Sequence, residues 1–131
     1  MDASASDRPH RAVVIDDATD IRDLMSIVLT RSGMDVVGVA PDGQAGVELV
    51  RAQRPDLVLL DLAMPVMDGV EALPLIRELV PDARIVVLSA FAGAVAEQML
   101  RSGADGYLEK GTPLKEIVAY LEANLDGAPG H

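Results

Sequence analysis

Three aspartates follow short aliphatic runs, at positions where buried strands would end. Asp16 and Asp17 come directly after AVVI, and Asp61 comes directly after LVLL. Carboxylates gathered at one edge of a sheet raise one another's pKa values unless a cation lies between them. Oxygen ligands without His or Cys are typical of Mg²⁺. The three aspartates therefore predict a magnesium site, and capping of the following helix by Asp17, Thr19 or Asp20 is the alternative interpretation.

Asp61 admits two roles, a third metal ligand or a nucleophile. A carboxylate that attacks phosphorus forms an aspartyl phosphate, and phosphoryl transfer also needs positive charge and hydrogen-bond donors around the phosphoryl oxygens. Lys110, after GYLE, supplies a charge, and Ser89, after IVVL, supplies a hydroxyl. Each alone would be an ordinary loop or strand-end residue. Their shared position after successive strands favours a phosphoryl site.

The elements that would position these residues alternate along the chain. Four short aliphatic runs and the segment GYLEK each precede a stretch with helical periodicity, and we expect the strands at 12–15, 36–40, 57–60, 85–88 and 106–110. Strand-then-helix units in series predict an α/β fold with a parallel sheet and helices on both faces. In such sheets ligands bind beyond the carboxyl ends of the strands, where all these polar residues would meet.

Two of the predicted helices have clear apolar faces. The first would bury Ile21, Leu24, Met25, Val28 and Leu29, which recur at helical spacing. The last would bury Leu114, Ile117, Val118, Leu121 and Leu125, with Tyr120 exposed on its outward side. The outward surface of the last two helices is the predicted partner or dimer surface.

Composition limits the class of protein. The chain has 131 residues, a net charge of −10 and no cysteine, so disulfides, thiolate metal sites and direct nucleic-acid binding by this segment are not expected. No apolar run is long enough for a membrane span or a signal peptide, which predicts a soluble cytoplasmic domain. We expect a disordered lead-in at 1–10, one domain at 11–125, and a tail or linker start at 126–131.

Four segments together resemble the receiver domain of two-component response regulators. They are VVIDDATD, DLVLLDLAMPVMDGVEAL, IVVLSA and GADGYLEK, in this order along nearly the whole chain. The resemblance implies a (βα)5 flavodoxin-like fold with strand order 2-1-3-4-5. It also implies a phosphoaccepting signalling domain rather than an enzyme with an external substrate, and a histidine kinase as partner.

The resemblance also implies a role for each residue of the site. Asp61 would accept the phosphoryl group, Asp17 would bind Mg²⁺ directly, Asp16 would act mainly through water, and the backbone carbonyl of Ala63 would be a further metal ligand. Ser89 and Tyr107 would be switch residues that respond to phosphorylation. Lys110 would contact the phosphoryl group.

The sequence says less about what the domain controls once it is phosphorylated. Gly111 follows Lys110, at a position where many receivers have proline. The segment YLEKG resembles receivers that are linked to LuxR-type helix-turn-helix output domains. This likeness implies control of transcription and a homodimer formed on phosphorylation. A stand-alone receiver that acts by protein–protein interaction is the alternative. An aspartate-nucleophile phosphatase is less favoured, because it would need an acid at the position of Ala63.

Overall fold

The computed structural model describes residues 10–64, 66–90 and 94–126. The strands are β1 (Arg11–Ile15), β2 (Asp35–Ala40), β3 (Leu57–Asp61), β4 (Arg84–Ser89) and β5 (Gly106–Glu109). The helices are α2 (Thr19–Arg31), α3 (Gly43–Gln53), α4 (Gly69–Leu79), α5 (Ala94–Arg101) and α6 (Leu114–Asp126). Most of the expected lead-in and tail lies outside the described residues, whereas Asp126, which we expected in the tail, ends α6.

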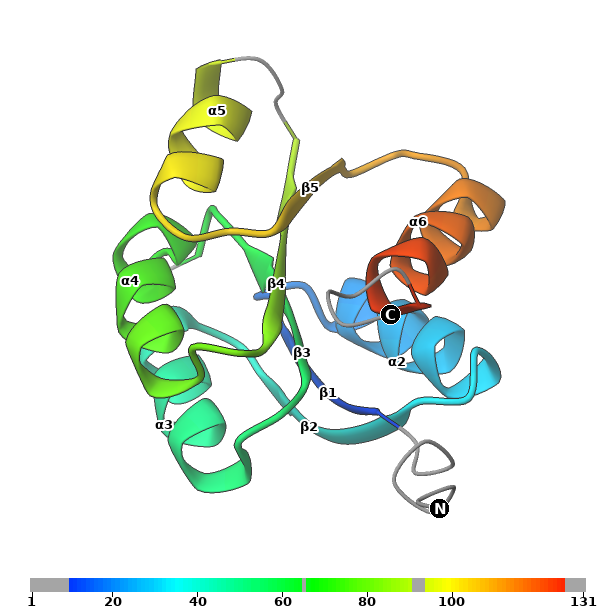
Figure 1. The fold of residues 1–131 in the computed structure, drawn as a ribbon, viewed down its shortest axis with the longest axis horizontal. Coiled ribbons are helices and arrows are strands. Elements are labelled where there is room, and N and C mark those ends of the chain that lie inside the picture. Colours follow the sequence, from blue (N-terminus) through cyan, green and yellow to red (C-terminus); the bar gives the residue numbers. More distant parts are fainter. Residues whose placement is uncertain (1–9, 65, 91–93, 127–131) are drawn as a thin grey trace.

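The five strands form one parallel sheet in the order β2-β1-β3-β4-β5 (Figure 1). This confirms the flavodoxin-like fold and the strand order that the resemblance implied. In the sheet, β2 lies on one side of β1 and β3 lies on the other, so the order of the strands changes direction at β1. The crevice at this change of direction lies at the carboxyl ends of β1 and β3, where such folds bind ligands.

Helices cover both faces of the sheet, as Figure 1 shows, with α2 and α6 on one face and α3, α4 and α5 on the other. Successive strand residues point to opposite faces. In β1, Val13 and Ile15 therefore pack with α3, α4 and α5, while Ala12 and Val14 pack with α2 and α6. Two buried faces explain why the strands read as unbroken aliphatic runs.

Two leucines predicted for the core are exposed. Leu24 on α2 has 39% of its surface exposed and Leu114, the first residue of α6, has 43%. The helical periodicity placed both on an apolar stripe, but the sheet covers only part of that stripe. Ile117 and Leu121 on α6 are buried as predicted.

Tyr120 was also assigned to the wrong environment, because it is half-buried rather than exposed. Its ring packs against the core between α2, α6 and the sheet, and its hydroxyl oxygen accepts a hydrogen bond from the Tyr107 backbone N–H at 3.0 Å. Gly106 leaves room for this hydroxyl, since a Cβ at that position would overlap it. Tyr120 thus pairs a backbone N–H of β5 at the edge of the sheet, where no further strand is available.

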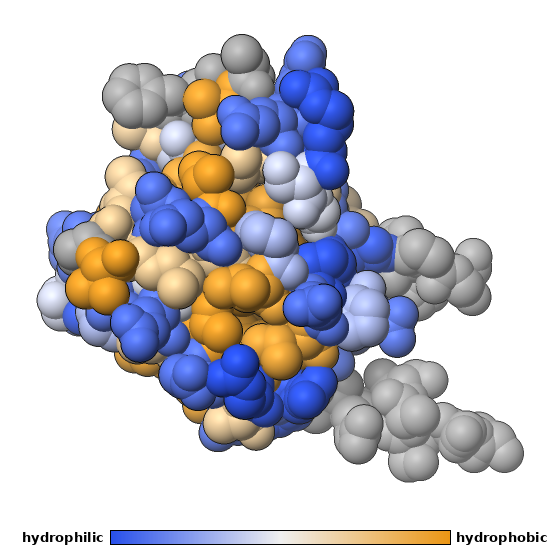
Figure 2. Space-filling view, turned by 90° about the vertical axis from the view of Figure 1, so that its left-hand side faces the viewer, coloured by the Kyte–Doolittle hydropathy of each residue, from blue (hydrophilic) through white to orange (hydrophobic). Residues whose placement is uncertain are grey.

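The outer face over α3, α4 and α5 also carries apolar surface. Figure 2 shows orange apolar patches there, interrupted by hydrophilic side chains. Leu75 on α4 and Leu100 on α5 are among the exposed apolar residues. No helix in the described part of the chain is long and apolar enough to cross a membrane.

Candidate functional site

The register of the sheet brings the three predicted aspartates together. Ile15 pairs with Leu60 across β1 and β3, so the next residues, Asp16 and Asp61, lie side by side at the end of the sheet. Their side chains are buried, with 0% and 1% of the residue surface exposed, while Asp17 is exposed. Carboxylate oxygens of the three residues lie within 4.8 Å of one another. The predicted acidic cluster is therefore present.

Lys110 joins the cluster from the end of β5. Its Nζ lies 3.2 Å from Asp16 Oδ2 and 3.2 Å from Asp61 Oδ1, so one ammonium bridges both buried carboxylates. Its backbone N–H donates to the Ser89 carbonyl at 2.7 Å. The chain then turns through Gly111 at a φ of +96°, a conformation that favours glycine. This turn accounts for a glycine rather than a proline after the lysine.

Burial and charge act in opposite directions on these groups. Desolvation by burial, followed by the charge of Asp16, raises the pKa of Asp61 from 3.8 to about 6, although Lys110 and the Ala63 N–H oppose the rise. For Lys110, burial disfavours the ammonium, but the two carboxylates outweigh it and raise its pKa above the ordinary value. A single lysine therefore does not compensate the cluster fully.

The oxygen atoms that remain fit a hard divalent cation. In the described part of the chain, no hydrogen-bond donor reaches the buried Asp61 Oδ2. Asp16 Oδ2 has Lys110 Nζ nearby as an ion-pair partner but accepts no directed hydrogen bond. Buried carboxylate oxygens without partners are costly. Three carboxylates with this geometry match the oxygen ligands that Mg²⁺ prefers.

Helix capping does not explain the acidic residues after β1. The N-cap position of α2 is Ala18, which makes no side-chain cap. Asp20 accepts only from its neighbour Ile21, at 3.0 Å, so its predicted role as the cap is wrong. Asp16 Oδ1 instead accepts from the Ala18 N–H at 2.9 Å. This bond orients the Asp16 carboxylate and leaves Asp17 without a capping function.

Arg22 is a residue of the site that the sequence did not lead us to predict. Its Nη1 donates to the Asp16 carbonyl at 2.7 Å, and its Nη2 donates to Thr19 Oγ1 at 3.1 Å. It closes the first turn of α2 and holds the loop between β1 and that helix. The available signal was a basic residue about one helical turn after the acidic doublet.

Ser89 lies on β4, the neighbour of the strand that ends in Asp61, and Tyr107 lies on β5, one strand further out. Ser89 is the last residue of β4 and is 6% exposed. Tyr107 lies in β5, packs against the core on the α3, α4 and α5 side, and is half-buried. No partner in the described chain reaches its buried hydroxyl. Ser89 follows Leu88, the residue that pairs with Asp61, so it lies at the expected end of the sheet. The switch roles of Ser89 and Tyr107 stay predictions.

The loop after Asp61 is held by backbone contacts. Ala63 donates its N–H to Asp61 Oδ1 at 3.3 Å. Gly69 donates its N–H to the Leu62 carbonyl at 2.9 Å, which folds the start of α4 back over the end of β3. Asp68 caps that helix with a reciprocal bond to Glu71. A metal-ligand role for the Ala63 carbonyl stays a prediction.

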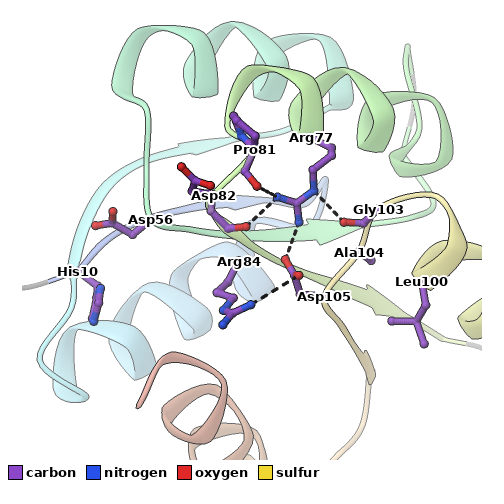
Figure 3. Close-up of a pocket in the computed structure, with 11 residues that line it drawn as sticks. His10, Asp56, Arg77, Pro81, Asp82, Arg84, Leu100, Gly103, Ala104 and Asp105 are labelled. Carbon is purple, nitrogen blue, oxygen red and sulfur yellow. Dashed lines mark hydrogen bonds and ion pairs between the residues drawn. The ribbon is translucent and has the colours of Figure 1, made fainter. Parts of the chain in front are cut away.

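A hollow of about 760 Å³ lies at the amino ends of the strands, at the end of the sheet opposite to the acidic cluster. Figure 3 shows that Arg77 from α4 points into it and bonds the Gly103 and Pro81 carbonyls and the Asp105 carboxylate. Arg84 also faces Asp105, at 3.7 Å. These partners hold α4 and the loop before β5 together, and the hollow contains none of the predicted site residues.

Comparisons with known proteins agree with this site. The family model described as "Response regulator receiver domain" matches residues 12–122. The chain is 33% identical over 112 residues to the chemotaxis protein CheY of Thermotoga maritima, covering 85% of this chain and 93% of the relative. It is 40% identical over 122 residues to a probable transcriptional regulatory protein NarL of Mycobacterium tuberculosis, covering 92% of this chain and 55% of the relative.

A solved structure supports the same assignment. The signal receiver domain of the putative response regulator NarL from Mycobacterium tuberculosis superimposes with a TM-score of 0.82 at 36% identity, covering 95% of this chain and 99% of that chain. The family match spans β1 to α6 and contains every predicted site residue. This chain therefore belongs to the response regulator receiver domains, the signalling domains of two-component systems.

Proposed function

We propose that the domain accepts a phosphoryl group on Asp61 from a phosphohistidine of a histidine kinase, in a Mg²⁺-dependent reaction. The observation that supports this most is the unequal use of the two Asp61 oxygens. Oδ1 faces Lys110 Nζ and the Ala63 N–H, whereas Oδ2 accepts no hydrogen bond from the described residues. One oxygen is oriented by cation and amide, and the other is left for attack.

The transfer balances as a simple displacement. An Asp61 oxygen forms a bond to phosphorus as the P–N bond to the histidine breaks, and the electron pair of that bond stays on the imidazole nitrogen, which takes a proton from water. Lys110, whose Nζ lies 3.2 Å from Asp61 Oδ1, would neutralise charge on the phosphoryl oxygens, and the Ser89 hydroxyl would donate to one of them.

The residues that would hold Mg²⁺ are Asp17 directly, Asp61 and the Ala63 carbonyl, with Asp16 acting mainly through water. When bound, the ion supplies positive charge that lowers the repulsion between the carboxylates and an incoming phosphate. Asp16 and Lys110 are held in place by the protein itself, through the Ala18 N–H and the paired carboxylates.

We further propose that phosphorylation moves Ser89 and Tyr107 and so alters the surface around α5, β5 and α6 for partner binding or dimerisation. The Tyr107 N–H bonds the Tyr120 hydroxyl of α6, which couples the proposed switch residue to the last helix. The likeness to the NarL relative supports control of transcription as the output. We propose that the domain acts in the cytoplasm. The alternative is a stand-alone receiver, supported by matches that span most of the CheY relatives.

Asp61→Asn is the variant that tests the phosphoacceptor. Wild-type protein incubated with acetyl phosphate and Mg²⁺ is expected to gain the mass of one phosphoryl group, which mild base removes. Asp61→Asn is expected to gain none, because an amide is not a nucleophile toward phosphorus. Intact-mass measurement with and without Mg²⁺ gives the result.

Asp23→Asn is the matched control, because Asp23 is an exposed aspartate on α2. It is expected to be phosphorylated like the wild type. An equal adduct on Asp61→Asn, or no adduct on the wild type, would contradict the proposal.

Lys110→Ala is expected to slow phosphorylation by about tenfold or more, since it removes the cation that faces the phosphoryl group. Its Mg²⁺ affinity, followed by titration, is expected to stay equal or to rise, because the ammonium competes with the metal for the same carboxylates. The exposed Lys115 provides the control, Lys115→Ala, which should change neither quantity. A collapse of Mg²⁺ affinity in Lys110→Ala would show that its role is misassigned.

A further inference from the structure

Arg22 bonds both ends of the short segment that joins β1 to α2. Its Nη1 donates to the Asp16 carbonyl at 2.7 Å, and its Nη2 donates to Thr19 Oγ1 at 3.1 Å. Asp16 directly follows the last residue of β1, and Thr19 is the first residue of α2. A guanidinium is planar and carries its donors in a fixed fork. The two bonds therefore hold the end of the strand against the start of the helix.

The bond to Asp16 also restricts the direction of Asp17. The Asp16 carbonyl belongs to the planar peptide unit that joins Asp16 to Asp17. A donor 2.7 Å from that oxygen opposes rotation of the peptide plane, and with it a change in the direction of the Asp17 side chain. The Asp17 carboxylate itself forms no hydrogen bond or ion pair with the described residues. Its position therefore depends on the backbone beside it.

Asp17 needs such support because its neighbours repel it. Carboxylate oxygens of Asp16, Asp17 and Asp61 lie within 4.8 Å of one another. Asp16 and Asp61 are buried, and each accepts a hydrogen bond from a backbone N–H two residues later. Asp17 is exposed, so solvent leaves its side chain free to turn away from two like charges. A contact that keeps it in the cluster has to act through the backbone, and Arg22 supplies one.

Helix preferences do not explain a base at this position. Arg22 closes the first turn of α2, where the positive end of the helix dipole disfavours a cation. Asp20 in the same turn is the kind of residue that the dipole favours. In the described part of the chain, Arg22 forms no ion pair with a carboxylate. Its two hydrogen bonds are the contacts that account for its place.

We propose that Arg22 is a positioning residue for the divalent cation. It holds the peptide unit between Asp16 and Asp17 so that the Asp17 carboxylate stays in the cluster with Asp61. This role rests on the proposed function, which assigns Mg²⁺ to the same aspartates. Arg22 contacts neither the ion nor the phosphoryl group in this arrangement. Residues that orient metal ligands in this way typically change metal affinity by about ten- to a hundredfold.

Position and charge predict opposite effects of Arg22 on Mg²⁺ affinity. A cation close to three carboxylates weakens their attraction for Mg²⁺, so a role through charge alone would oppose metal binding. A role through the two hydrogen bonds would support it. Removal of the guanidinium therefore raises the affinity in the first case and lowers it in the second.

The first test is a calorimetric titration of the metal-free protein with Mg²⁺. Arg22→Ala is expected to raise the Kd for Mg²⁺ about tenfold. Arg22→Lys is expected to raise it nearly as much, because an ammonium keeps the charge but cannot present a planar fork to both acceptors. Arg31→Ala removes an exposed base from the other end of α2 and is the control, with a Kd within about twofold of the wild type.

The sign of the change decides between the two roles. Tighter Mg²⁺ binding by Arg22→Ala, together with an unchanged Kd for Arg22→Lys, would overturn the proposal, because charge would then be the whole contribution.

Thr19→Val tests the fork itself, since it removes the hydroxyl and keeps the shape of the side chain. The Kd for Mg²⁺ is expected to rise about threefold, because Nη2 loses its acceptor while Nη1 keeps the Asp16 carbonyl. The double variant with Arg22→Ala should bind Mg²⁺ no more weakly than Arg22→Ala alone, because both residues act through one contact. Losses that add up would contradict this shared contact.

Two further measurements separate metal binding from folding and from phosphoryl transfer. Urea unfolding in EDTA should give Arg22→Lys a midpoint within about 0.5 M of the wild type. A larger loss of metal-free stability with an unchanged Kd would make Arg22 a purely structural residue. With acetyl phosphate, the phosphorylation rate of Arg22→Lys should approach that of the wild type at saturating Mg²⁺. A rate that stays low there would place Arg22 in the transfer step, and either result overturns the proposal.

Failure of the proposed function would look different. A wild type that binds Mg²⁺ without being phosphorylated contradicts the phosphoacceptor role of Asp61, whereas the titrations still decide the role of Arg22. A wild type that binds no Mg²⁺ overturns both.

Discussion

Asp61→Asn is expected to stabilise the metal-free protein at pH 8, by up to about 3 kcal/mol in the free energy of unfolding. The raised pKa of Asp61, about 6 against 3.8, means that folding holds a proton on this carboxyl between these pH values. The stability associated with that proton is present below about pH 4 and is lost as the pH rises through 6. Asn carries no charge to desolvate, so the variant avoids this loss.

The pH profile gives the sign of the effect. The advantage of Asp61→Asn should be small near pH 4, grow between about pH 4 and 6, and stay constant above. Urea unfolding in EDTA, followed by circular dichroism across this range, measures it. Asp23→Asn should show no such growth, because Asp23 is exposed. Equal stability of wild type and Asp61→Asn at pH 8 would contradict the account of the acidic cluster.

Magnesium should stabilise the wild type more than it stabilises Asp61→Asn. A ligand that binds only the folded state stabilises it according to its concentration and affinity. The wild type, with Asp61 charged at pH 8, is expected to gain more from Mg²⁺ than Asp61→Asn does. The same unfolding experiment repeated with about 10 mM Mg²⁺ tests this. A gain of equal size in both proteins would place the cation away from Asp61.

Gly69→Ala is expected to cost about 2–4 kcal/mol of stability and to lower the yield of phosphorylation. A Cβ on Gly69 would overlap the Asp61 carbonyl oxygen and lie 2.8 Å from Leu62 Cα. Both obstacles are backbone atoms at the end of β3. Relief therefore requires a shift of Asp61 itself, so stability and site geometry should fail together.

Gly38→Ala is the control for this prediction. There the new methyl group would meet only the side chain of Leu49, with its Cδ1 at 2.6 Å, and a flexible side-chain end can move. Its cost should stay below about 1 kcal/mol. Urea unfolding and intact-mass measurement after acetyl phosphate treatment compare the two variants. A Gly69→Ala protein as stable as the wild type would show that the loop can move independently of β3.

The site could be predicted because parallel strands end at one edge of the sheet. Asp16, Asp61 and Ser89 each follow an aliphatic run, and Lys110 follows the predicted strand GYLE. These positions along the chain are visible without coordinates. The register could not be predicted in the same way. It depends on the pairing of Ile15 with Leu60, which places two carboxylates side by side under one ammonium.

The contacts that hold the site together also required coordinates. Arg22 reaches the Asp16 carbonyl, and Gly69 packs on the backbone of Asp61, and neither contact follows from residue type or spacing. Each contact joins the start of a helix to the end of the strand before it. Only the path of the chain through the fold brings them together.

By itself the sequence determined the number and order of the βα units, and the chemistry that gathers at one edge of the sheet. The periodicity of an element tells which side is apolar and which residues follow its end. Only the tertiary structure decided how much of each apolar side is covered. Leu24, Leu114 and Tyr120 show this: the sheet and the neighbouring helix leave the two leucines exposed and enclose the tyrosine. Coverage depends on where neighbouring elements lie, and no single helix carries that information.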